Sequence, residues 1–217
     1  MTITAIPAEQ TTAATDLVLA VVAVGCALAV RKPGRALPFR LRTWTWIFGL
    51  LALAAAAGAV AHGLERSDIW SGALWRLIYL ALGLTVALFV AAAVHDWKGR
   101  GVASRLTPML VSVGVGFFLV TQIWSGSFLV FVIYEAVAML LALGFYLVLA
   151  LRRRLAGAWL MVVAIVLNIA AAAVQASSLS VTVVVPFDHN GVFHVVQLTA
   201  VLVLTAGLIR GFRAAAH

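Results

Sequence analysis

Histidines and a glutamate interrupt the long apolar runs of this sequence, and they are the residues best suited to chemistry. His62 ends one apolar run, His194 lies near the start of another, and Glu135 lies inside a third. Such side chains are costly to place in an apolar run, and they usually face a bundle interior or a wet cavity. Neutral imidazoles bind zinc and leave a position for water, whose proton a carboxylate can accept. The three residues are therefore candidates for a metal-dependent hydrolytic site.

The elements that position these residues are expected to be transmembrane helices. The chain is 65% hydrophobic and 10% charged, with a mean hydropathy of +1.13, whereas about 25% of the residues of a soluble domain are charged. A helix crosses a hydrocarbon core of about 30 Å with roughly 20 apolar residues. We expect one all-α domain over residues 1–217, with transmembrane helices at about 14–30, 43–62, 70–94, 103–124, 127–150, 155–176 and 190–209.

The basic residues predict how this bundle lies in the membrane. All of the 15 lysines and arginines except Arg66 and Arg76 fall in the first, third and fifth connections or in the C-terminal tail. The positive-inside rule then places the N-terminus outside and the C-terminus in the cytoplasm. The net charge of +8 reflects this topology rather than a nucleic-acid surface. The high arginine and alanine content favours a bacterial protein, hence a multi-pass protein of the plasma (inner) membrane.

Polar side chains from six of the predicted helices fall in one layer near the outer face. In the last helix, Asn190, His194 and Gln197 are spaced at i, i+4 and i+7 and share a face. The inner halves of the same helices are almost entirely Ala, Val, Leu and Gly. The candidates for substrate binding are Gln122, Asn168, Asn190 and Gln197.

The third predicted helix carries Arg76 and Tyr79 at the outer side, near the expected depth of Glu135. In a hydrolase, Glu135 would act as the general base, while Arg76, Tyr79 or Asn190 would stabilise an oxyanion. The alternative is a structural ion pair between Arg76 and Glu135, because a buried carboxylate must be neutral, paired or bound to a metal.

Other polar residues have structural interpretations. Asp188 is placed to cap the last helix, with Phe187 and Val192 as a hydrophobic staple. His189 lies in a loop or first turn, where it is either solvated or a metal ligand. The end of the third helix is expected to carry surface residues at the cytoplasmic side: His95, Asp96 and Trp97.

A histidine ending the second helix and a histidine motif opening the seventh resembles the superfamily of alkaline ceramidases and progestin/adipoQ receptors. That superfamily is associated with intramembrane zinc hydrolases, in which one ligand ends helix 2 and two come from an H-x-x-x-H on helix 7. The resemblance implies His62 and His194 as zinc ligands. Asn190 stands where the first histidine of the H-x-x-x-H motif belongs, so the third ligand is open between His189 and Asn190. Gly58 replaces the superfamily's serine.

Two main functions follow from this pattern. The first is a zinc-dependent hydrolase of a lipid amide or ester, with His62, His189 and His194 as ligands in the outer half of the bundle. The alternative is a non-catalytic receptor or transporter that binds a small polar or lipid ligand in the same pocket. A haem protein, with His62 and His194 as axial ligands, is a third possibility. The expected partners are membrane lipid and a lipid or small-molecule substrate, with no nucleic acid.

Overall fold

The structure of the protein is a computed structural model that describes residues 2–65, 67–124 and 129–215. Seven helices in these ranges are long and apolar enough to cross a membrane, which confirms the predicted all-α architecture of a multi-pass membrane protein. They are α1 (Pro7–Ala29), α3 (Pro38–Gly63), α4 (Asp68–Lys98), α5 (Arg100–Ile123), α6 (Leu129–Leu151), α7 (Ala158–Gln175) and α8 (His189–Ala214).

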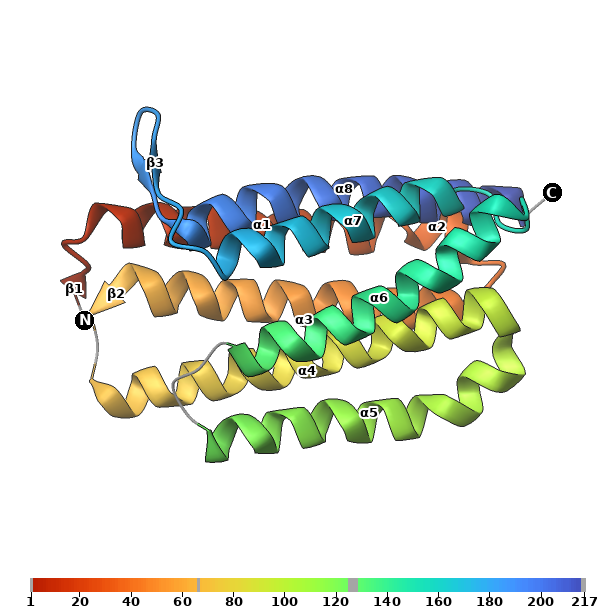
Figure 1. Ribbon diagram of the computed structural model, residues 1–217, viewed down its shortest axis with the longest axis horizontal. Helices are drawn as coiled ribbons and strands as arrows, with labels where there is room; N and C mark the ends of the chain where they lie inside the picture. The colour runs from red at the N-terminus through yellow and green to blue at the C-terminus, as the bar shows by residue number, and fades with distance from the viewer. Residues whose placement is uncertain (1, 66, 125–128, 216–217) are drawn as a thin grey trace.

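Short elements connect these helices. α2 (Arg31–Gly34) is a single turn between α1 and α3. β1 (Thr2–Ile3) pairs antiparallel with β2 (Leu64–Glu65), which ties the start of the chain to the end of α3. β3 (Val181–Thr182) and β4 (Pro186–Phe187) form a hairpin that projects from the bundle between α7 and α8 (Figure 1). Both strand pairs lie at the end of the bundle where α1 begins, which we call the N-terminal end.

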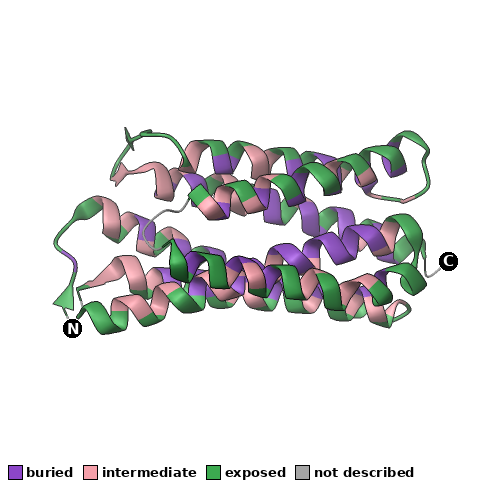
Figure 2. Ribbon diagram, turned by 60° about the horizontal axis from the view of Figure 1, so that its bottom comes forward, coloured by how far each residue is buried: buried purple, intermediate pink, exposed green. Residues whose placement is uncertain are grey.

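Six of the long helices surround a common interior, and α5 lies outside them. α1 packs against α3 and α8, α4 against α3 and α6, and α7 against α6 and α8. α5 packs on α4 along one edge of the molecule (Figure 1), and it meets α6 mainly through Phe117, whose ring stacks on Tyr134. Buried residues line the inward faces of the six helices (Figure 2), and the largest fully buried side chains include Trp44, Tyr146 and Phe48.

Several helices extend beyond the apolar runs of the sequence, among them α1 and α5. α1 begins at Pro7 rather than near residue 14, because Pro7 opens the helix and Glu9 lies in its first turn. The apolar run therefore marks only the later part of α1, and its first turns are polar. α5 begins at Arg100, before the apolar run, and includes Pro108 in its interior.

Glycines allow close helix contacts at two places. A methyl group on Gly83 of α4 would lie 2.7 Å from the carbonyl oxygen of Gly114 on α5. Gly157, at φ 83°, precedes α7 and lies against the backbone of Gly207 on α8. Only glycine adopts that backbone conformation readily. These small residues thus serve packing within the chain.

The end of α4 opposite the N-terminal end corrects one expectation from the sequence. Asp96, predicted to lie at the surface, forms an ion pair with Arg40 of α3 at 2.8 Å, and both side chains are 2% exposed. The Tyr146 hydroxyl donates to Asp96 at 3.0 Å, and the Arg40 guanidinium lies 4.7 Å from the Phe212 ring centre. His95 lies beside the pair, with Nδ1 3.2 Å from Asp96. Three helices close over this position, so a residue near a helix end is still buried.

Replacing Asp96 by asparagine should destabilise the protein strongly. The substitution removes one charge and leaves the buried Arg40 guanidinium unpaired, which costs about 3–5 kcal/mol in comparable buried pairs. The melting temperature in detergent should fall sharply for D96N and less for the double variant R40M/D96N, where no buried charge remains. Equal stability of D96N and the natural protein would contradict this role.

Candidate functional site

A cavity of about 720 Å³ opens at the N-terminal end of the bundle. Aromatic and aliphatic side chains form part of its wall, among them Trp75, Phe131 and Phe193. It brings together eight of the residues that the sequence singles out: His62, Arg76, Tyr79, Gln122, His189, Asn190, His194 and Gln197. The predicted convergence of polar groups at one end of the bundle is therefore present for most of these residues.

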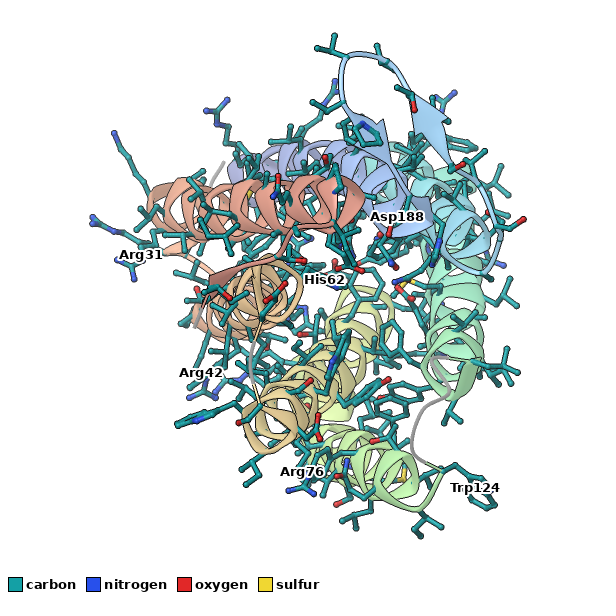
Figure 3. All side chains as sticks on the ribbon, turned by 90° about the vertical axis from the view of Figure 1, so that its left-hand side faces the viewer. Arg31, Arg42, His62, Arg76, Trp124 and Asp188 are labelled. Carbon is teal, nitrogen blue, oxygen red and sulfur yellow. The ribbon has the colours of Figure 1, made fainter. Side chains whose placement is uncertain are left out.

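Glu135 and Asn168 lie elsewhere. They line a separate chamber of about 60 Å³, to which Gln197 also contributes. Arg76 is exposed, and in Figure 3 its side chain lies at the periphery of the bundle. Among the described residues, no ion pair joins Arg76 to Glu135, so the alternative of a structural pair is wrong. Arg76 and Glu135 were expected at a similar depth in the membrane, but their side chains do not face each other.

The most buried polar contact of the cavity joins α1 to α8. Nε2 of His194 lies 3.3 Å from Oδ1 of Asp16, and the two residues are 7% and 4% exposed. Nδ1 of His194 lies 3.0 Å from the Thr15 hydroxyl oxygen, whose own hydrogen goes to the Thr12 carbonyl. The hydroxyl oxygen must then accept from Nδ1. Asp16 and His194 thus form a close, buried contact between α1 and α8, which is an ion pair when the imidazole is protonated and the carboxyl group is ionised.

His62 is held by a second carboxylate from α1. Its Nδ1 lies 2.6 Å from Oε2 of Glu9, and its ring meets Trp75 edge-on at 5.7 Å between ring centres. A carboxylate at Nδ1 fixes the ring and its tautomer, and it leaves Nε2 as the available nitrogen. Figure 3 shows His62 turned toward the space between the helices.

Asp188 caps α8, as the sequence predicts. Its carboxylate accepts from the Gly191 amide and from the Thr12 hydroxyl, each at 2.8 Å, and from the Asn190 amide at 3.4 Å. Burial alone would raise the pKa of Asp188, but these hydrogen bonds and nearby His189 outweigh it and hold the pKa below its ordinary value. The cap thereby joins the start of α8 to α1. It also fixes the position of His194 along the axis of α1.

The histidines do not form a closed metal site in this structure. Within the described ranges, no group of three His, Cys, Asp or Glu side chains is arranged to hold a metal ion. Nδ1 of His62 contacts Glu9, and both nitrogens of His194 contact α1. The present side-chain positions therefore do not fit zinc, and the ligand set of His62, His189 and His194 stays a prediction.

Sequence reasoning missed the contribution of α1. Four of its side chains contact the histidines or the α8 cap, and none was among the candidates: Glu9, Thr12, Thr15 and Asp16. A signal was present, because residues 9, 12 and 16 are polar and spaced as one helical stripe. Starting the helix near residue 14 left Glu9 and Thr12 outside it, so the stripe was not recognised.

Gly58 of α3 is needed for the Asp16–His194 contact. A methyl group at Gly58 would lie 2.6 Å from Oδ2 of Asp16, so G58A should displace that carboxylate and lower the melting temperature. In a helix interior, alanine is normally about 1 kcal/mol more favourable than glycine. The matched control is G49A in the same helix, where no atom lies within 4 Å of the added methyl. G49A should be neutral or stabilising, and the same result for G58A would contradict this packing.

Comparison with known proteins gives a family but no activity. No curated protein and no solved structure matches the chain. The profile of a family of unknown function, DUF6962, matches residues 11–212, a range that includes the Asp16–His194 pair and His62. This match covers most of the chain and all or most of each of the seven long helices. The protein therefore belongs to the DUF6962 family.

Proposed function

We propose that the protein is a non-catalytic binder of a small amphiphilic molecule, held in the cavity at the N-terminal end. The cavity volume of about 720 Å³ falls within the 300–1,000 Å³ typical of ligand sites. Its wall alternates hydrogen-bonding side chains with apolar ones. A ligand with one apolar chain and an uncharged, hydrogen-bonding head matches this wall.

The observation that carries the proposal is an unpartnered acceptor in the cavity wall. Gln175 lines the cavity and donates weakly to Asn190 at 3.5 Å, but its Oε1 is buried without a hydrogen-bond partner. An unsatisfied buried acceptor costs roughly 1–3 kcal/mol. A ligand that donates a hydrogen bond there would remove this cost, so the amide is suited to recognise an N–H or O–H group.

The Asp16–His194 pair supplies a complementary feature of the same wall. It places a carboxyl group 3.3 Å from an imidazole, so the acid and the base balance each other's charge when both are ionised. A charged head group would have to be desolvated without a partner of opposite sign deep in the cavity. Arg76, the cationic lining residue, is exposed. These features favour a neutral head group over an ionic one.

Oleoylethanolamide is a suitable probe, because it has a single chain and an amide head with two donors. Its addition should raise the melting temperature of the purified protein by mass action. Replacing Gln175 by leucine should reduce this rise by removing the acceptor. Gln10→Leu is the matched control, since Gln10 is exposed outside the cavity, and it should keep the rise. Equal responses of the two variants, or none in the natural protein, would contradict the proposal.

A zinc-dependent lipid hydrolase is the second candidate, and one observation favours it. Glu9 holds His62 through Nδ1, as carboxylates hold many zinc-ligating histidines. Binding without hydrolysis predicts that purified protein lacks stoichiometric zinc and releases no oleate from oleoylethanolamide. One zinc per chain that is lost in H194A, but kept in the control H95A, would instead establish the second candidate. Elemental analysis measures the zinc content per chain, and mass spectrometry of the lipid measures the release of oleate.

A further inference from the structure

The small chamber around Glu135 is separate from the proposed ligand cavity. It measures about 60 Å³ and lies deeper between the helices, sharing Leu51, Leu82, Phe131 and Gln197 with the cavity above. This space is too small for an organic ligand, but it exceeds the roughly 10–15 Å³ that one water needs. It therefore fits an ion with one or two waters.

The carboxyl group of Glu135 lacks a hydrogen-bond partner at one of its oxygens in this chamber. The residue is 6% exposed, and its Oε2 is buried without a hydrogen-bond partner. Arg76 does not reach it, and no ion pair to Glu135 occurs within the described residues. A buried carboxylate in a membrane bundle must be neutralised by a proton, a partner or a bound cation.

The other polar groups of the chamber are mainly oxygen donors. Asn168 and Gln197 each offer an amide oxygen, and the Thr85 hydroxyl already donates to the Ala81 carbonyl, which leaves its oxygen free to coordinate. Hard cations take such carboxylate, amide and hydroxyl oxygens as ligands. The Trp44 indole N–H, buried and without a partner, can donate to a water that completes the shell.

We propose that this chamber binds one sodium ion through Glu135, Asn168, Gln197 and Thr85. Among the residues that the structure describes, Glu135 is the one carboxylate that lines the chamber, so a monovalent cation gives a neutral complex, whereas a divalent cation would leave an unbalanced charge. Gln197 lines both spaces, which places the ion next to the larger cavity. The inference does not depend on which ligand that cavity holds.

Purified full-length protein should be stabilised by sodium. With choline chloride holding the ionic strength constant, raising NaCl from about 1 to 150 mM should raise the melting temperature by roughly 2–5 °C. Radioactive sodium should bind at one site per chain. E135Q keeps the side-chain shape and needs no counter-ion, so it should fold, lose the sodium response and bind no sodium.

The matched control is E65Q, which removes an exposed carboxyl from β2 and should respond like the natural protein. N168L is a second variant for the case in which E135Q folds poorly. It should reduce the rise in melting temperature that sodium causes. Equal melting temperatures in sodium and choline, or a sodium response that survives in E135Q, would overturn the proposal.

Discussion

A charge inside a membrane bundle must be balanced, and much of this structure follows from how its acids meet that requirement. Asp96 pairs with Arg40 between the consecutive helices α4 and α3, and Asp16 pairs with His194 between the first and the last helix. Removing a partner from such a pair is costly. The two contacts therefore tie α3 to α4 at one end and α1 to α8 at the other, and they set the level at which neighbouring side chains lie.

The contact between α1 and α8 organises the larger cavity. Asp188 begins α8 and accepts from Thr12, so the first turn of α8 is held at a fixed height on α1. His194 then lies beside Thr15 and Asp16. Gly58 on α3 leaves the space that the Asp16 carboxylate occupies. A resemblance based on His62 and His194 alone overlooks this acidic helix, which engages the same two histidines through hydrogen bonds.

The helices could be predicted from the sequence because lipid imposes a length and an apolar composition on every span. The cap at Asp188 was also predictable, since it depends on residues three apart. The surroundings of Glu135 and the partner of Asp96 were not, because depth along a helix says nothing about its rotation or about which helix faces it. Glu135 and Arg76 share a depth but face different spaces, whereas Arg40 and Asp96 meet although both lie near helix ends. Such contacts depend on tertiary packing.

The two ends of the bundle differ in a way that bears on transport. The N-terminal end contains the large cavity, while the other end is closed by Arg40, Asp96, Tyr146 and Phe212 from four helices. Passage through the protein would require these helices to separate and would leave two buried charges without partners. Binding at the N-terminal end requires no such rearrangement. The structure therefore describes a state in which the large cavity lies at the N-terminal end and buried, paired charges close the opposite end.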